Sequence, residues 1–171
     1  PMQRHATMTP SQPADSKIPD RSSQVRRPAI VWPGADVAGD STVSLFFDRA
    51  SATLRNGGWR ERIAAWAFRS GARLSAPWGY RGFAAASSGI RRMMPKREIV
   101  VRLSADTLFA FPFGDGYWSL LFNPDYRYER DIERFFRGIA GANYTLIDCG
   151  ANFGYWSVLV TSDAFGAQRA L

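Results

Sequence analysis

An acid and two glycines near the C-terminal end of the chain have the residue types and the spacing of a ligand-binding loop. Asp148 follows a short apolar run, Gly150 and Gly154 interrupt the chain, and an apolar segment of helical character resumes at Tyr155. This order predicts a strand, a loop and a helix, which together open a nucleotide-type α/β unit. Glycines allow backbone N–H groups to approach a ligand closely, and the carboxyl end of a strand is where α/β sheets hold their ligands.

The spacing of the two glycines narrows the class of ligand. Gly-x-x-x-Gly differs from the Gly-x-Gly-x-x-Gly of a dinucleotide site, and no Gly-Lys-Ser/Thr follows it. Pyrophosphate and triphosphate ligands are therefore poorly supported, and a smaller nucleoside ligand fits better. The alternative is a turn at a sheet edge that binds no ligand.

The stretch Asp-Cys-Gly-Ala-Asn-Phe-Gly-Tyr-Trp-Ser at 148–157 resembles the first S-adenosylmethionine motif of class I methyltransferases. It is similar in particular to the Asp-x-Gly-Ala-Asn-x-Gly-Tyr form of the FkbM family, and the resemblance covers residues 98–171. The resemblance implies an S-adenosylmethionine-dependent O-methyltransferase that acts on a hydroxyl of a sugar, polysaccharide or natural product. The chain would hold the N-terminal part of such an enzyme, through this motif only.

The resemblance also implies cofactor-binding roles for residues in the motif and shortly before it. Asp148 would orient the methionine end of the cofactor, and Tyr155 would start the helix under the cofactor's carboxylate. Glu129 would approach the positively charged end of the cofactor, because it belongs to a Tyr-Glu pair similar to one that the family places before its motif. The equal alternative is that Glu129 is simply an acid at a helix N-terminus, where the helix dipole favours a negative charge. Close backbone approach would come from Gly150, Ala151, Asn152 and Gly154.

The sequence assigns no catalytic residue and no metal ligand. The resemblance implies that the acid that holds the ribose, and most of the residues that form the general base and the substrate pocket, would lie beyond Leu171. His5 is the only histidine and Cys149 the only cysteine, so a zinc site, a histidine-based triad and an internal disulfide have no local support. We expect Cys149 to be a small apolar filler at the end of a buried strand rather than a reactive thiol.

Composition and charge indicate one globular domain. The 171 residues are 46% hydrophobic and 14% aromatic, enough for one sizeable core. The net charge of +7 is the balance of 22 basic and 15 acidic residues, and the basic ones occur along the whole chain rather than in one block, so we expect general solubility and no nucleic-acid partner. A small-molecule or glycan substrate is what the family resemblance implies. No apolar run is long enough to span a membrane and the first 28 residues lack a secretory signal, which predicts a cytoplasmic protein.

The chain divides into three predicted segments. Residues 1–40 are rich in proline and polar side chains, and we expect a disordered arm. Residues 41–97 are predicted to be a helical segment. Residues 98–171 are predicted to be a β-meander followed by the first βα unit of a truncated methyltransferase domain.

Within the helical segment, a helix capped by Ser41 or Thr42 is expected to run to Arg55 and to pair with a second helix over 59–70. A short helix is predicted over 84–94. The second helix is amphipathic, and the residues predicted to share one face are Ile63, Trp66, Ala67 and Ser70. Packing of this pair on the domain or on a partner is favoured. An interfacial membrane helix is the alternative, because arginines surround Trp59, Trp66 and Trp78.

The remaining residues carry strand and helix periods. Strands are predicted over 99–103, 107–111 and 117–122, as an antiparallel meander. A helix over 128–138 is expected to cover a strand over 144–149 with an apolar face made of Ile132, Phe135, Phe136 and Ile139. A helix over 155–162 would follow the motif. The predicted fold class is α/β, the start of a class I methyltransferase Rossmann-like domain.

Two other functions remain open on the sequence alone. One is a non-catalytic fragment or partner-binding module, and the other is a nicotinamide-dependent oxidoreductase, since glycine loops of this kind are shared among α/β folds. With few residues after the motif to pair with it, the strand over 144–149 is expected to expose an apolar edge and to favour oligomerisation or aggregation. The chain that ends at Leu171 is expected to transfer no methyl groups.

Overall fold

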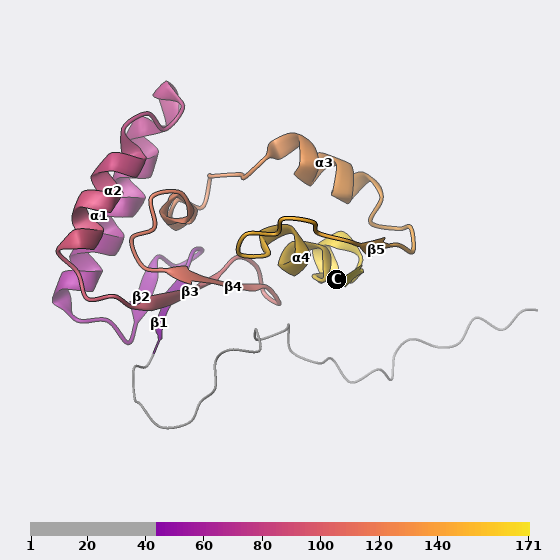
Figure 1. Ribbon diagram of the computed structural model, residues 1–171, viewed down its shortest axis with the longest axis horizontal. Coiled ribbons are helices and arrows are strands. Elements are labelled where there is room, and N and C mark those ends of the chain that lie inside the picture. The colour runs from indigo at the N-terminus through magenta and orange to yellow at the C-terminus, as the bar shows by residue number, and fades with distance from the viewer. Residues whose placement is uncertain (1–43) are drawn as a thin grey trace, which may run out of the picture.

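The computed structural model describes residues 44–171, which form a mixed α/β fold. The arm predicted over 1–40 and the helix caps predicted at Ser41 and Thr42 lie outside these residues. Figure 1 shows the helices α1 and α2 side by side above a four-stranded sheet, with α3, α4 and β5 at the C-terminal side of the molecule.

The residues predicted to form the first helix form a β-hairpin instead. β1 (Leu45–Asp48) pairs antiparallel with β2 (Thr53–Arg55). Leu45 and Phe47 are buried while their neighbours in β1 are half-buried, which is the period of two that a strand produces. The prediction of a helical hairpin is therefore wrong, because alternate residues of β1 are buried and its aromatic residues favour a strand.

A side-chain turn signal explains where β1 ends. The Asp48 carboxylate accepts hydrogen bonds from the backbone N–H groups of Ala50 (2.9 Å) and Ser51 (3.2 Å). An aspartate that bonds to the backbone two and three residues later reverses the chain and competes with a helix.

The helices predicted over 59–70 and 84–94 are both present. α1 (Trp59–Ser75) runs beyond the predicted end, and a 3-10 turn leads to α2 (Phe83–Arg92). Gly71 does not stop α1, and a Cβ built on it would be in ordinary van der Waals contact with the Phe83 ring at 3.7 Å.

The face of α1 that packs is not the predicted one. The buried side chains are Ala64, Ala65, Phe68 and Ala72, together with Glu61. The face that carries Ile63 and Trp66 points away from the core. Small alanines on the inner face let the helix axis approach the layer beneath it closely, whereas the bulky side chains remain outside.

The four-stranded sheet has the order β2-β1-β3-β4. β3 (Glu98–Arg102) pairs antiparallel with β4 (Leu108–Pro112) and parallel with β1. Two strands of the predicted meander are thus confirmed, and the parallel partner β1 was not predicted.

The third predicted strand, over 117–122, is wrong. Trp118–Phe122 is a 3-10 helix, η3, and it is buried throughout. The Asp115 carboxylate accepts hydrogen bonds at 2.9 Å from the backbone N–H groups of both Tyr117 and Trp118, which winds the chain at that point. A short apolar run that is buried on all sides has no period that separates a strand from a helix.

Aromatic rings make up the core between α1, η3 and the sheet. Phe122 of η3 contacts Phe47 of β1 and Phe68 of α1, with ring centroids 4.5 Å and 5.4 Å apart. Phe113, just after β4, completes the group at 5.6 Å from Phe68. These contacts fix α1 above the sheet.

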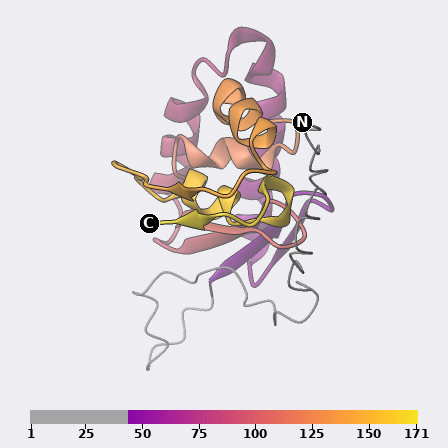
Figure 2. The same cartoon turned by 90° about the vertical axis from the view of Figure 1, so that its right-hand side faces the viewer.

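The C-terminal part contains the predicted strand, loop and helix. β5 (Thr145–Leu146) leads to α4 (Tyr155–Val160), and β6 (Arg169–Ala170) returns parallel to β5. Figure 2 shows β6 beside the C-terminal end of the chain, with α3 above it. β5 is shorter than the predicted strand over 144–149, and among the described residues it pairs on one side only.

α3 (Arg130–Gly138) confirms the predicted helix, but only part of its predicted apolar face is covered. The Phe136 ring stacks on Tyr144, next to β5, with centroids 6.1 Å apart. Ile132 and Phe135 are exposed. The helix therefore contacts the motif unit through one edge of the face.

A buried arginine ties the N-terminal hairpin to the segment before α3. Arg49 is 7% exposed, and its Nη2 donates hydrogen bonds to the carbonyl oxygens of Asn123 (2.7 Å), Tyr126 (3.0 Å) and Pro124 (3.3 Å). Three backbone carbonyls without helix or sheet partners thus share one charged donor group.

Replacing Arg49 with methionine is expected to lower the free energy of unfolding by about 2 to 4 kcal/mol, because the carbonyls lose a charged donor while they stay buried. Urea unfolding followed by circular dichroism measures this. Arg134→Met, at an exposed arginine of α3 with one surface ion pair, is the control and should change stability by less than about 1 kcal/mol. Equal stability of the two variants would contradict the prediction.

Candidate functional site

The loop between β5 and α4 places Asp148 at the end of the strand, as predicted. The Asp148 N–H donates a hydrogen bond to the Leu171 carbonyl (3.2 Å), and the Leu171 N–H donates to the Leu146 carbonyl (2.9 Å). The backbone pairing with β6 therefore continues to the acid itself. The Asp148 carboxylate accepts a hydrogen bond from the Ser157 hydroxyl of α4 at 3.0 Å.

The loop has the backbone shape that its glycines were predicted to allow. Gly150, Asn152 and Gly154 have φ angles of +95°, +51° and +73°, in the left-handed region that glycine and asparagine tolerate best. The Gly154 N–H donates to the Ala151 carbonyl at 2.6 Å, which closes the turn before α4. A Cβ built on Gly150 would meet no atom within 4 Å, so the space outside this residue is open.

The structure brings Glu129 to the motif. The Glu129 carboxylate accepts a hydrogen bond from the indole N–H of Trp156, the second residue of α4, at 2.8 Å. Glu129 has a φ of +45°, a left-handed conformation that costs free energy in a residue with a side chain. The conformation is held where the chain enters α3, so the acid lies beside the motif although it is 27 residues away in sequence.

Two carboxylates are therefore anchored to consecutive residues in the first turn of α4. Asp148 is bonded to Ser157, and Glu129 is bonded to Trp156. Each of these bonds places an acidic side chain next to the first turn of α4, and an acid suits a ligand group that carries a positive charge. Acids near a helix N-terminus are also favoured by the helix dipole, although α4 has only six residues.

Tyr155 starts α4 as predicted, but its side chain belongs to the core. The ring is 7% exposed and contacts Phe109, Trp118 and Tyr128 with centroid distances of 5.2 to 5.3 Å. Burial raises the pKa of the Tyr155 hydroxyl to about 12, with the charge of Arg49 acting in the opposite direction. Only the backbone of Tyr155 is available to a ligand in the loop.

Cys149 is exposed, which corrects the expectation of an apolar filler. The reason is the early end of β5: Cys149 lies in the loop and not in a buried strand.

The sequence did not predict the role of Gln168, a buried side chain that joins separate backbone segments at the β5-α4-β6 unit. This residue is 8% exposed; its side-chain amide donates to the carbonyls of Ala140, Ala142 and Gly166, and its oxygen accepts from the Tyr144 N–H. It fastens the entry of β5 to the turn before β6. A single glutamine among polar and small residues carries no sequence signal of this role.

A second link joins the motif unit to the four-stranded sheet. The Asp106 carboxylate, in the turn between β3 and β4, accepts a hydrogen bond from the Asp163 N–H at 2.7 Å. This bond lowers the pKa of Asp106 from its ordinary value of 3.8, with further help from the hydroxyls of Ser104 and Thr107. The ionised carboxylate therefore stabilises the contact between the two parts.

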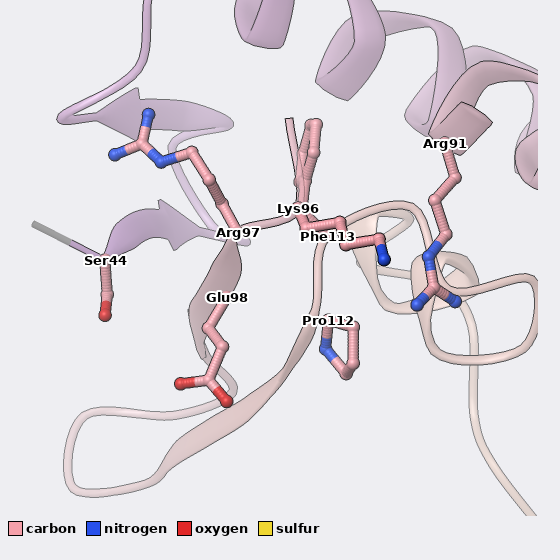
Figure 3. Close-up of a pocket in the computed structure, with 7 residues that line it drawn as sticks. All are labelled: Ser44, Arg91, Lys96, Arg97, Glu98, Pro112 and Phe113. Carbon is pink, nitrogen blue, oxygen red and sulfur yellow. The ribbon is translucent and has the colours of Figure 1, made fainter. Parts of the chain in front are cut away.

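Two hollows on the surface lie away from the motif. One, of about 330 Å³, is lined by Ser44, Arg91, Lys96, Arg97, Glu98, Pro112 and Phe113. Figure 3 shows that the Arg91 and Lys96 side chains reach toward one part of it, while Arg97 and Glu98 diverge from them. Arg91 is within 3.9 Å of Asp115, and Arg97 is within 3.5 Å of Glu61. Two of the three basic side chains that line this hollow are thus paired with acids. The second hollow lies between β2 and α1.

Neither a metal site nor a membrane-spanning helix is found in the part of the chain that the structure describes. Residues 44–171 contain no group of three or more His, Cys, Asp or Glu side chains placed to hold a metal ion. In the same range, every helix is too short or too polar to cross a bilayer.

Comparisons of the chain with protein-family models, with curated proteins and with solved structures find no match.

The Asp106 contact predicts a dependence of stability on pH. Because the folded state lowers the pKa of Asp106, its stabilising effect is complete well above 3.8 and is lost as the pH falls through and below that value. Asp106→Asn should therefore be less stable than the native chain at neutral pH, and the difference should shrink near about pH 3. Urea unfolding at the two pH values measures it. Asp131→Asn, at an exposed acid of α3, should show no such pH-dependent difference.

Proposed function

We propose that the chain binds S-adenosylmethionine at the loop over 147–154. It would form the cofactor-binding part of an O-methyltransferase of the FkbM type, acting on a hydroxyl of a sugar, polysaccharide or natural product. The observation that carries the proposal is the hydrogen bond between Glu129 and Trp156, which holds a second, conformationally strained acid at the first turn of α4, the same turn whose Ser157 bonds to the motif acid Asp148. A turn that binds no ligand would not require this second acid.

The residues fit the charges of the cofactor. S-adenosylmethionine carries an ammonium and a sulfonium group, and the acids Asp148 and Glu129 are two partners of opposite charge. Its carboxylate would be met by backbone N–H groups of the loop, where the left-handed residues Gly150 and Asn152 turn the chain. A parallel β5-α4-β6 unit with a loop at the strand end supports a Rossmann-like continuation of the fold.

The chain's own contribution to catalysis would be placement. The bound cofactor supplies the methyl group, and the acids and the loop hold it in one orientation so that an acceptor hydroxyl is aligned with that group. The rings of Trp118 and Tyr128 pack against Tyr155 at the start of α4 and would support the loop from the core side. A cytoplasmic location belongs to this proposal.

Replacing Gly150 with valine tests the loop directly. The branched side chain would occupy the open space outside the loop, so we expect S-adenosylmethionine affinity to fall by at least about 100-fold in titration calorimetry. Gly79→Val is the control, because Gly79 also has a left-handed φ (+64°) and a side chain there also meets open space, but it lies away from the motif. Unchanged affinity in Gly150→Val, or binding of NAD in place of S-adenosylmethionine, would contradict the proposal; NAD binding would favour an oxidoreductase.

Trp156→Phe tests the acid pair. Phenylalanine keeps the aromatic packing but removes the N–H that holds Glu129, so we expect cofactor affinity to fall by about three- to tenfold while the unfolding midpoint changes little. Trp66→Phe, on the outer face of α1, is the control and should leave affinity unchanged. Equal affinities would show that Glu129 only caps α3.

A further inference from the structure

The outer face of α1 carries large apolar side chains that nothing among the described residues covers. Trp59, Ile63, Trp66 and Leu74 are 68%, 55%, 69% and 72% exposed. Their spacing of four, three and eight residues places them on one stripe along the helix. Trp78 and Met93, beyond α1, are also exposed. Contiguous apolar surface of this kind marks an interaction site.

This stripe lies opposite the face that holds α1 in the fold. At 100° per residue, the stripe is centred about half a turn away from Ala64, Phe68 and Ala72, which are buried. The helix is therefore anchored by small residues and one phenylalanine, and its bulky residues do not contribute to the core. These side chains are therefore available to bind an apolar partner.

Arginines border the stripe. Arg62, Arg69 and Arg73 fall along one side of it and Arg60 along the other, by the same helical spacing. The Arg60 guanidinium lies 5.4 Å from the centroid of the Trp59 ring, so charge and aromatic surface are presented together.

The charge of the whole chain is concentrated in this region. Residues 59–97 contain nine basic residues and one acid, whereas the rest of the sequence contains 13 basic and 14 acidic residues. The one acid, Glu61, is buried and paired with Arg97 at 3.5 Å. Basic residues occur along the whole chain, as the sequence indicated, but the acids that balance them are missing from the two-helix layer of Figure 1.

We infer that the outer face of α1 binds the surface of an anionic lipid bilayer, with the helix parallel to the membrane plane. Tryptophans are suited to the interface between headgroups and acyl chains, the aliphatic side chains to the acyl boundary, and the flanking arginines to anionic headgroups. The surface is independent of the proposed cofactor loop.

Charge and chemistry favour a bilayer over two other occupants. A second copy of the chain would bring two strongly basic faces together without an exposed acid on either helix face. A nucleic acid would use the arginines and stack on the tryptophans, but it would leave Ile63 and Leu74 without an apolar partner.

Co-sedimentation of the full chain with vesicles tests this inference. The probes are vesicles of phosphatidylcholine alone and vesicles in which about a third of the lipid is phosphatidylserine. We expect at least about tenfold tighter binding to the anionic vesicles, a blue shift of tryptophan emission on binding, and weaker binding in about 0.5 M salt.

Matched double variants distinguish binding through the α1 stripe from non-specific binding to vesicles. Ile63→Ser with Trp66→Ser should weaken anionic-vesicle binding at least about tenfold, and Arg60→Gln with Arg73→Gln should do the same through charge. The controls, Leu108→Ser with Phe135→Ser and Arg130→Gln with Arg134→Gln, remove exposed residues of the same kinds elsewhere and should stay within about twofold of the native chain.

Several results would overturn the inference. These are equal binding to both vesicle types, native-like binding by the α1 variants, or equal losses in the control variants. A dimer in sedimentation velocity that the Ile63→Ser and Trp66→Ser pair dissociates would assign the face to a second copy instead. An oligonucleotide that binds through the same arginines, with no vesicle binding, would assign it to nucleic acid.

Discussion

The stacking of Trp118 against Tyr155 is the contact on which the placement of the β5-α4-β6 unit against the four-stranded sheet depends. The rings lie 5.3 Å apart at an angle of 26°, and Phe109 of β4 meets both, at 4.8 Å and 5.3 Å. One strand of the sheet, the buried 3-10 helix and the first residue of α4 are thereby joined by a single aromatic cluster, which Tyr128 extends toward Glu129. Without this cluster the loop would have no rigid base from which to hold a ligand.

Local periodicity predicted the elements whose pattern was long or sharply alternating. α1, α2, α3, β3 and β4 were all foreseen, because apolar residues repeat in them at helix or strand spacing, although several of those residues in α1 and α3 are exposed in the fold. The hairpin of β1 and β2 and the helix η3 were not. In both, an aspartate carboxylate that bonds to nearby backbone N–H groups decides the local shape, and its effect was outweighed in the sequence by apolar spacing.

The same division holds for the candidate site. The positions of Asp148, Gly150 and Gly154 follow from the motif, because turn geometry is a local property of residue type. The contact of Glu129 with Trp156 was not predicted, since the family resemblance implied only that Glu129 approaches the cofactor. The roles of Arg49 and Gln168 were not foreseen at all, since both side chains bond to backbone carbonyls outside helices and strands, and only the tertiary fold brings those carbonyls within reach.

The reach of Arg49 has a consequence for how the chain can be divided. From the end of β1 this side chain fixes the carbonyls that precede α3, and β1 itself lies between β2 and β3 in one sheet. The stretch before Glu98 is thus no detachable appendage, because it supplies an interior strand and the only charged group bonded to those carbonyls among the described residues. A shortened protein that begins at β3 would lose an interior strand of its sheet and the side chain that binds the carbonyls before α3. A graft of the motif onto another scaffold would have to include the β1–β2 hairpin.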